Sequence, residues 1–423
     1  MTQSSESQHL VDHLFRQEAG KMVAVLTKLF GLPNVETAQD IVQETLLTAL
    51  EAWKLGTIPD NPRAWLYRTA KNRALDHLRR LYIWQAKIAP DVAQALGDES
   101  TAQQQLDVLF LDAEIEDSQL RMLFACCHPA LAPEGQIALI LKTLCGLSVS
   151  EIAAAFLSTR DNIEKRLYRT REKIRYDRIT LEVPLGDELP PRLDGVLKAV
   201  YLLFSEGYHS ASSDEVIRHA LCDEALRLAD LLARHPVVGL PKTQALLALL
   251  CFQASRFEAR LDAGGQVVLL EDQDRCRWDQ ALIARGFAQL TRSASGGEAS
   301  DYHLEAAIAS YHAQADSLEN TNWQAIFYLY QLLWQRQPNP IVAFNRAIAL
   351  GYAQGAAAGL EALLAITTLR DNHFYQAALG DFYRKTGDST KSRRAYQTAW
   401  ALAVLPREKQ LIAGKLAKLP ANQ

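Results

Sequence analysis

One stretch of the chain decides most of its fold: residues 147–175, which read LSVSEIAAAFLSTRDNIEKRLYRTREKIR. Ser148 can cap a helix, and Glu151 three residues later completes a capping box. A break is expected at 157–158, after which a second helix begins. This second helix turns three aliphatic side chains inward, namely Ile163, Leu167 and Ile174. A short helix, a tight turn and a second, basic helix form a helix-turn-helix motif.

The outward side of the second helix is polar and mostly basic. In a helix-turn-helix this helix enters the major groove, where Arg and Asn suit the edges of guanine and adenine and other cations hold phosphates. A solvated amphipathic helix with scattered cations is the alternative, which the capped helix before it disfavours. The residues expected to contact DNA are Thr159, Arg160, Asn162, Lys165, Arg166 and Arg169.

Helix-forming composition extends over the rest of the 423 residues, so the predicted fold class is all-α. Val, Ile and Thr do not alternate with polar residues for long, and turn-forming clusters break the chain at 31–34, 56–62 and 184–191. The expected division is a first module 1–88, an acidic linker 89–117, a second module 118–180, a helical extension 181–300 and helical repeats 301–423.

The net charge of −4 hides an uneven distribution. Residues 60–87 hold seven Lys or Arg against two Asp, and residues 158–178 hold eight against four acids. Between them, residues 88–120 hold eight acids and neither Lys nor Arg. Two basic blocks on either side of an acidic connector predict two DNA-contacting modules on a solvated tether.

These motifs resemble those of the extracytoplasmic-function sigma factors, which direct RNA polymerase to promoters. The helix-turn-helix is similar to region 4.2 of that family, which binds the −35 promoter element. Residues 40–53 (DIVQET at the start, Trp53 at the end) resemble region 2.2. Residues 61–76 (NPRAWLYRTAKNRALD) resemble regions 2.3 and 2.4, which melt and read the −10 element. The two resemblances cover about residues 10–80 and 118–178, in the family's order.

The resemblance implies core RNA polymerase, through its β′ clamp helices and β flap, and promoter DNA as partners. It implies that region 2.2 contacts the polymerase through Asp40, Gln43 and Glu44, where a solvated helix face would otherwise be expected. The −10 contacts that it implies are Arg68, Lys71, Asn72, Arg73, Arg79 and Arg80. Asn72 and the loop 54–60 would line a pocket for a flipped base. For Trp65, core packing is favoured over base stacking.

Two features depart from the typical family pattern. The turn of the motif commonly has glycine followed by an apolar residue, whereas Leu157-Ser158 occupies this place. Since glycine is favoured where φ is positive, the turn and the base-contacting register are expected to differ. The chain also continues for about 240 residues beyond the recognition helix.

The long tail resembles the sigma-factor subgroup that carries a tetratricopeptide-like C-terminal extension. Residues 201–208 and 271–278 carry this likeness, and residues 374–405 match the spacings of one repeat. The alternative is an irregular α-helical bundle. The resemblance implies regulation by the fused domain, which would sense a protein or peptide partner or shield the DNA-binding modules. For Glu206, Asp272, Asp274 and Arg275, structural ion pairs are favoured over a catalytic cluster.

The sequence offers no catalytic, metal or cofactor set. Its six cysteines contain no CxxC pair and are expected to be buried, reduced thiols. No apolar run is long enough to span a membrane and the polar start is not a signal peptide, so a cytoplasmic protein is expected. The predicted function is a non-enzymatic sigma factor. A helix-turn-helix regulator with a sensor domain, or a repeat scaffold with a vestigial sigma half, are the alternatives.

Overall fold

The regular structure of the chain is helical. A computed structural model describes residues 2–55, 58–88, 104, 106–180, 188–209, 217–262, 264–295, 297 and 299–420. In this part of the chain every named element is a helix, and Leu261 and Val267 form an isolated bridge. The all-α prediction is confirmed. Most of the expected acidic linker, part of the 54–60 loop and the Pro184 boundary lie outside the described residues.

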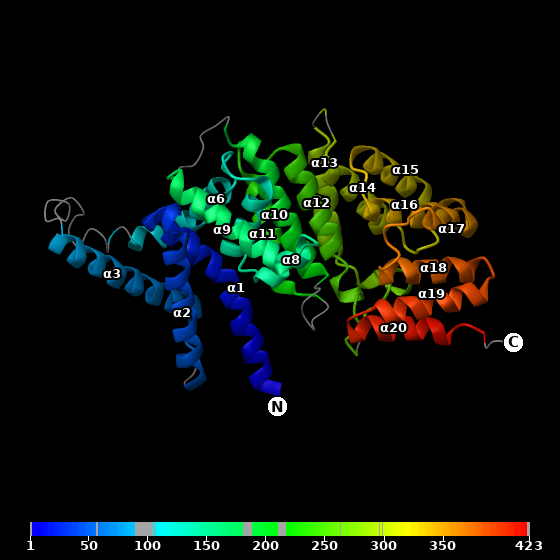
Figure 1. Cartoon of the computed structure of the whole chain (residues 1–423), viewed down its shortest axis with the longest axis horizontal. Helices are drawn as coiled ribbons and strands as arrows, with labels where there is room; N and C mark the ends of the chain where they lie inside the picture. The colour runs from blue at the N-terminus through cyan, green and yellow to red at the C-terminus, as the bar shows by residue number, and fades with distance from the viewer. Residues whose placement is uncertain are drawn as a thin grey trace. The chain divides into compact units, whose positions relative to one another are not determined.

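The chain divides into two compact units, Met1–Gly239 and Leu240–Gln423, drawn from blue to green and from green to red in Figure 1. The boundaries expected from the sequence at residues 180 and 300 stay predictions. No helix in the described part of the chain has the length and apolar content that a membrane span requires.

The first unit begins with the helices of the first basic module. These are α1 (Thr2–Phe30), the short η1 (Leu32–Asn34), α2 (Val35–Leu55) and α3 (Pro62–Ile88). The second module contributes α6 (Asp112–Cys126), α7 (Pro133–Thr143), α8 (Val149–Ala155) and α9 (Arg160–Tyr176). The first two helices of the extension, α10 (Pro190–Tyr208) and α11 (His219–Arg234), complete the unit.

The two basic modules pack directly on one another through α1. This helix contacts α2 and α3 on one side and α6 on another. Gly20 of α1 lies so close to the carbonyl oxygen of Leu144, at the end of α7, that a Cβ at this position would collide with it. The side chains of Met22, Val25 and Leu26 are fully buried. Glycine at position 20 therefore permits the close approach of the two modules.

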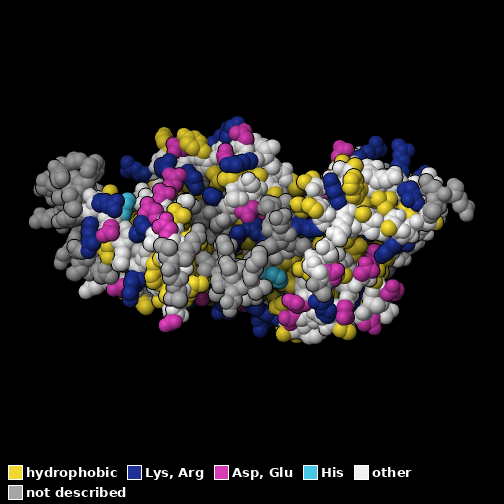
Figure 2. All heavy atoms as spheres, turned by 90° about the horizontal axis from the view of Figure 1, so that it is seen from below, with side chains coloured by type: hydrophobic (Ala, Val, Ile, Leu, Met, Phe, Trp, Pro, Cys, Tyr) yellow, Lys and Arg dark blue, Asp and Glu magenta, His cyan; other side chains and the backbone are white. Residues whose placement is uncertain are grey.

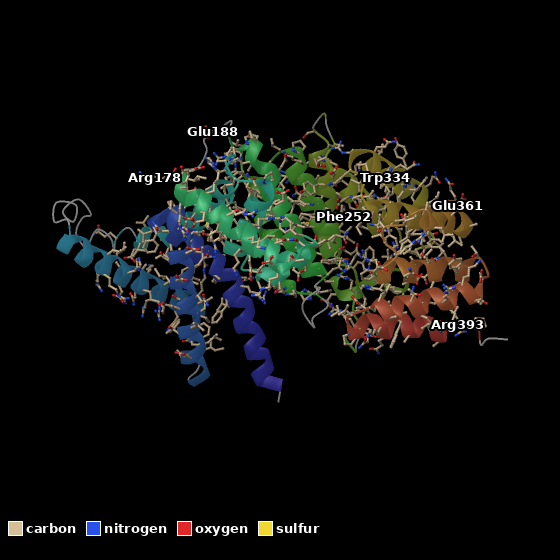
Figure 3. The ribbon with its side chains drawn as sticks, in the orientation of Figure 1. Arg178, Glu188, Phe252, Trp334, Glu361 and Arg393 are labelled. Carbon is tan, nitrogen blue, oxygen red and sulfur yellow. The ribbon has the colours of Figure 1, made fainter. Side chains whose placement is uncertain are left out.

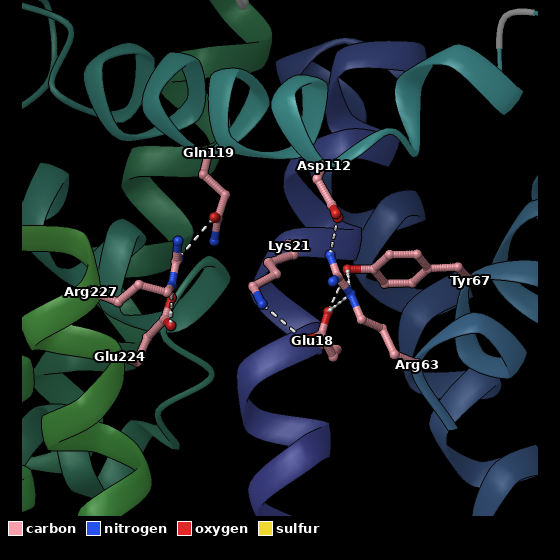
Figure 4. A network of polar contacts seen from close by, with 8 residues as sticks. All are labelled: Glu18, Lys21, Arg63, Tyr67, Asp112, Gln119, Glu224 and Arg227. Carbon is pink, nitrogen blue, oxygen red and sulfur yellow. Dashed lines mark hydrogen bonds and ion pairs between the residues drawn. The ribbon is translucent and has the colours of Figure 1, made fainter. Parts of the chain in front are cut away.

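The extension shares a core with the second module. A Cβ at Gly195 of α10 would lie 2.8 Å from Sγ of Cys127. Arg227 of α11 donates a hydrogen bond of 2.8 Å to Gln119 of α6, as Figure 4 shows. The folding unit therefore does not end with the helix-turn-helix, because α10 packs on α6, α7 and α8, and α11 packs on α10.

The second unit is a succession of helices that pack on their neighbours in the chain. Its helices are α12 (Pro241–Ala254), α13 (Gln280–Ser293), α14 (Asp301–Gln314), α15 (Trp323–Arg336), α16 (Pro340–Gln354), α17 (Ala356–Leu364), α18 (His373–Lys385), α19 (Ser389–Leu402) and α20 (Pro406–Ala417). Phe252, labelled in Figure 3, packs its ring on Phe287 with centroids 4.9 Å apart. Residues 374–405 form the α18–α19 pair, in which Gly380 lies against Tyr396. The tetratricopeptide likeness itself stays a prediction.

Candidate nucleic-acid interface

The helix-turn-helix forms as its local sequence predicts. Ser148 Oγ accepts a hydrogen bond of 3.2 Å from the Glu151 amide, and Glu151 Oε2 accepts one of 2.5 Å from the Ser148 amide. The predicted capping box is therefore confirmed. The three inward residues of α9, Ile163, Leu167 and Ile174, are buried as expected.

The turn of the motif keeps a positive φ without glycine. Leu157 has φ of 50° and is 89% exposed. The Ser158 amide donates to the Ala153 carbonyl at 2.8 Å, and the Thr159 side chain caps α9 through the Asn162 amide at 3.3 Å. Left-handed backbone costs a residue with a Cβ roughly 1–2 kcal/mol. The turn thus keeps its hydrogen bonds, but the positive φ of Leu157 makes it strained.

The outward face of α9 carries most of the residues predicted to contact the −35 element. Asn162, Lys165 and Arg169 are exposed on this face, and Thr159 and Arg160 are exposed at its start. The partners of Lys165 and Arg160 come from the same helix: Asp161 at 2.8 Å and Glu164 at 2.8 Å.

Arg166 differs from the other predicted contacts because it is partly buried. Its guanidinium lies 5.1 Å from the ring centroid of Phe156, so it holds α9 against α8. Sequence reasoning missed two aromatics on the outward side of α9, Tyr168 (65% exposed) and Tyr176. The helical period that placed Lys165 and Arg169 outward also places Tyr168 there.

The last turns of α9 contact the first module. Arg171 lies 3.3 Å from Glu36 and donates to Gln39 at 3.3 Å, and Arg175 also binds Glu36. Both partners belong to α2. Only the first half of α9 is therefore available as a DNA-binding face.

The −10 candidates of α3 lie on two sides of that helix. Arg68, Lys71 and Asn72 line a cavity of about 390 Å³, together with Ala64, Tyr67, Asp107 and Phe110. Arg79 and Arg80 are exposed further along the helix. Arg73 turns away from the cavity, since its guanidinium binds Glu44 and donates to Thr48 Oγ1 at 2.6 Å.

The three residues predicted to contact the polymerase share one exposed face of α2. Asp40, Gln43 and Glu44 are all exposed, and Leu47, 52% exposed, continues the same face one turn later. Sequence reasoning missed Leu47, although its position four residues after Gln43 and three after Glu44 places it on this face. An exposed leucine between polar groups suits a protein-binding surface.

A polar network joins α3 to α1 (Figure 4). Tyr67 donates a hydrogen bond to Glu18 of α1 and accepts one of 3.1 Å from Arg63. Burial and the Glu18 charge raise the pKa of Tyr67 well above its ordinary value. Trp65 is partly buried and packs on the buried Trp53, with ring centroids 5.6 Å apart; its expected packing role stays a prediction.

A second buried network anchors the helix-turn-helix to the extension. Arg218 binds Glu151 of α8 and lies 3.4 Å from Glu206 of α10. Burial alone would raise the pKa of Glu151, but the hydrogen bonds from Ser148 and the Arg218 guanidinium lower it below its ordinary value. Glu206 thus forms an ion pair, as the sequence led us to expect. In the second unit, Arg275 differs from that expectation, because it donates to the carbonyl oxygens of His312 (2.6 Å) and Ala315 (2.8 Å) instead of pairing with a carboxylate of the described residues.

The thiols and carboxylates in the described part of the chain show no metal site. Five cysteines are buried and Cys276 is exposed, all of them free. Burial raises the pKa of Cys127 to about 12, so this thiol stays protonated. No group of three or more His, Cys, Asp or Glu side chains is placed to hold a metal among the described residues. On the surface seen in Figure 2, basic and acidic side chains are interspersed over both units.

Comparisons with known families agree with the two modules. The family model of sigma-70 region 2 matches residues 14–82, and that of sigma-70 region 4 matches residues 121–174. A family of unknown function (DUF6596) matches residues 192–294, a range that crosses the division at Gly239.

Two curated proteins extend this comparison. An uncharacterized protein of Rhizobium meliloti is 36% identical over 392 residues, which is 92% of this chain and 91% of the relative. The ECF RNA polymerase sigma factor SigE of Mycolicibacterium smegmatis is 26% identical over 167 residues, 39% of this chain and 60% of that protein. No solved structure matches the chain. With region 2 and region 4 both present in order, the chain belongs to the sigma-70 factors of the extracytoplasmic-function type.

Proposed function

We propose that the protein binds core RNA polymerase, directs it to promoters with separate −35 and −10 elements, and performs no covalent chemistry itself. One observation carries this proposal: a single folding unit holds two helices, α3 and α9, that each present cations and an asparagine to solvent. A simple repressor needs only one such helix, so the second argues for a two-part DNA site.

The −35 element is assigned to the first half of α9. Asn162 and Arg169 have the side chains that read adenine and guanine edges, and Lys165 suits a phosphate. Thr159 and Arg160 flank them at the helix start. Arg166 acts mainly by holding α9 against α8, because its guanidinium lies over Phe156.

The −10 element is assigned to the Arg68, Lys71 and Asn72 side of α3. These residues form one wall of the 390 Å³ cavity, and this wall offers an amide to an unstacked base beside cations for the DNA backbone. Arg79 and Arg80 extend the basic track along α3. Arg73 instead joins α3 to Glu44, so its contribution is to position α2 relative to α3.

The polymerase is assigned to the α2 face formed by Asp40, Gln43, Glu44 and Leu47. Its acids are exposed and its one leucine is half uncovered, a combination suited to a protein partner rather than to DNA. The β′ clamp helices are the proposed contact.

The second unit is proposed to regulate this activity by binding a protein or peptide. A cavity of about 670 Å³ supports this role. Tyr352 forms part of its wall, stacked on Trp323 with centroids 4.3 Å apart, and the Lys385 ammonium lies 4.1 Å from the Tyr352 centroid. Asp381 and Lys415 form an ion pair of 2.6 Å in the same wall. Aromatic surface beside charges of both signs suits a polypeptide ligand.

Run-off transcription tests the function. Purified core polymerase and the full-length protein are incubated with the DNA upstream of the protein's own gene and of its neighbours. Specific transcripts that depend on the protein are expected. The double variant Lys165→Glu/Arg169→Glu should lose them, and Asp40→Lys/Leu47→Arg should lose core binding in a pull-down.

The matched control is Arg234→Glu, a charge reversal at an arginine of α11 that is 65% exposed and pairs with Asp230 of the same helix. It should transcribe like the wild type. Protein that neither transcribes nor binds core polymerase would reject the sigma function and favour the repeat-scaffold alternative. Promoter binding without core binding would favour an ordinary helix-turn-helix regulator.

A further inference from the structure

The described end of the acidic connector lies against the first module. We call residues 106–117 the acidic segment: it holds five acids and neither Lys nor Arg. Its first part precedes α6, and its second part is the first turns of α6, which packs on α1. Sequence reasoning expected this stretch to be a solvated tether, whereas here its side chains have specific partners.

Four of the five acids of the acidic segment bind cations of α1 or α3. Asp107 lies 2.8 Å from Lys71 Nζ, and Asp112 lies 2.5 Å from Arg63. The remaining two bind Lys28 of α1: Glu114 at 2.7 Å and Asp117 at 3.4 Å. Figure 4 shows Asp112 reaching from the start of α6 to Arg63.

Apolar packing fixes the acidic segment in this place. Leu106 is fully buried and Phe110 is 8% exposed. The Phe110 ring lies 5.2 Å from that of Tyr67, and the Lys71 ammonium lies 5.5 Å from the Phe110 centroid. Salt does not screen the apolar burial of Leu106 and Phe110, whereas it weakens the ion pairs.

The acidic segment covers the side of α3 that we assign to the −10 element. Asp107 and Phe110 form one wall of the cavity whose other wall holds Arg68, Lys71 and Asn72. The Asp107 carboxylate binds the Lys71 ammonium, which is the group that would bind a DNA phosphate, and its negative charge repels the DNA backbone. Asp107 and a phosphate therefore compete for Lys71.

We propose that the acidic segment is an internal ligand of α3, which competes with single-stranded promoter DNA for Lys71 and leaves before the −10 element binds. The proposal rests on the proposed DNA-binding function of α3. Exposed ion pairs are individually weak, so a strand of DNA bound at several points can displace this segment.

The test measures binding of a labelled single-stranded oligo(dT) probe to the full-length protein by fluorescence anisotropy, without polymerase and at low salt. Asp107→Asn/Asp112→Asn removes two of the ion pairs and keeps the side-chain shapes. It should bind the probe roughly 3- to 10-fold more tightly than the wild type. The gain should shrink at high salt and largely vanish when Lys71→Ala is added.

Glu116→Gln is the matched control, since it removes one charge from the same segment at an exposed acid that forms no ion pair with α1 or α3 among the described residues. It should change the affinity by less than about twofold. A double variant that binds like Glu116→Gln, or a gain that survives Lys71→Ala, would overturn the proposal.

Run-off transcription with the same proteins distinguishes a failure of the internal-ligand proposal from a failure of the proposed sigma function. Wild-type transcription together with an unchanged affinity in Asp107→Asn/Asp112→Asn would reject the internal ligand and leave the sigma function intact. No transcription from any variant, and no effect of Lys71→Ala on probe binding, would instead reject the assignment of α3 to DNA.

Discussion

The two helices that we propose to bind DNA, α3 and α9, are alike in composition but differ in where the partners of their cations come from. On the outward half of α9, Lys165 and Arg160 pair with acids of the same helix, and Arg169 forms no ion pair among the described residues. On α3, Lys71 and Arg73 bind acids from other segments. On the proposed assignment, the α9 face can bind DNA without losing partners from other segments, whereas the α3 face must first release them.

The supports beneath the two faces differ as well. The helix-turn-helix is anchored by the buried ion pair of Glu151 with Arg218, while the acidic segment meets α3 through ion pairs that are largely exposed. Buried and exposed pairs respond differently to mutation, because only a buried partner is left in a medium that cannot hydrate it. The support of α8 is therefore expected to be more sensitive to mutation than the contact of the acidic segment with α3.

The largest effect is expected from Arg218→Ala. It leaves Glu151 and Glu206 without the guanidinium between them, which should cost the first unit about 3–5 kcal/mol of unfolding free energy. Chemical denaturation followed by circular dichroism measures this. Arg234→Ala, at an exposed pair of α11, should cost less than about 1 kcal/mol. Equal losses of unfolding free energy in the two variants would contradict the expected difference between buried and exposed ion pairs.

Gly20→Ala tests whether the two modules must touch. The added Cβ would collide with the Leu144 carbonyl, a backbone group that cannot turn aside, so a loss of about 3 kcal/mol is expected. The same denaturation experiment applies. Gly414→Ala in α20 meets open space and should be neutral or slightly stabilising. Full stability of Gly20→Ala would show that the modules separate at little cost.

Charge reversal compares the two faces directly. Lys165→Glu/Arg169→Glu should weaken binding of the isolated protein to duplex DNA by roughly 30-fold, about 2 kcal/mol. Lys71→Glu alone should weaken it by less than about threefold, because Asp107 already neutralises Lys71. Electrophoretic mobility shift at low salt measures both. A larger loss of DNA affinity from Lys71→Glu would contradict the conclusion that Lys71 is neutralised by another segment whereas the α9 cations are not.

Acidification should weaken the interactions of Glu151 that stabilise α8. The pKa of Glu151 is lowered in the folded protein, so its contribution is complete above its unfolded value of about 4.5 and is lost as pH falls through the folded pKa. Stability should therefore fall on acidification, because protonation removes the charge that the hydrogen bonds from Ser148 and the Arg218 guanidinium stabilise. Thermal unfolding of wild type and Glu151→Gln across this range tests it: the variant should be less stable near neutrality and show a shallower acid limb. Parallel curves would exclude Glu151 as the titrating group.

The smallest effect is expected at the turn. Leu157→Gly removes the strain of a positive φ but adds freedom to the unfolded chain, so a net gain of about 0.5 kcal/mol is expected. Ala155→Gly, at the last residue of α8, should instead lose up to about 1 kcal/mol. Thermal denaturation of both variants compares them. Destabilisation by Leu157→Gly would mean that the leucine side chain stabilises the turn despite its exposure.

The sequence by itself determined the features that depend on neighbours three or four residues apart. The Ser148–Glu151 capping box, the buried stripe of α9 and its outward Asn162, Lys165 and Arg169 all follow from helical geometry. Region 2 and region 4 could be recognised for the same reason, because their motifs are local. Even the departure at Leu157 was visible as a missing glycine.

Only the tertiary structure decided which distant groups meet. Lys71 and Arg73 look equivalent in the sequence, yet Lys71 turns to Asp107 and Arg73 to Glu44, since they lie on different sides of α3. The pairing of Arg218 with Glu151 equally depends on how α10 and α11 pack on the second module. The helical period determines on which side of a helix a side chain lies. Which group it contacts there depends on the packing of segments that are far apart in the chain.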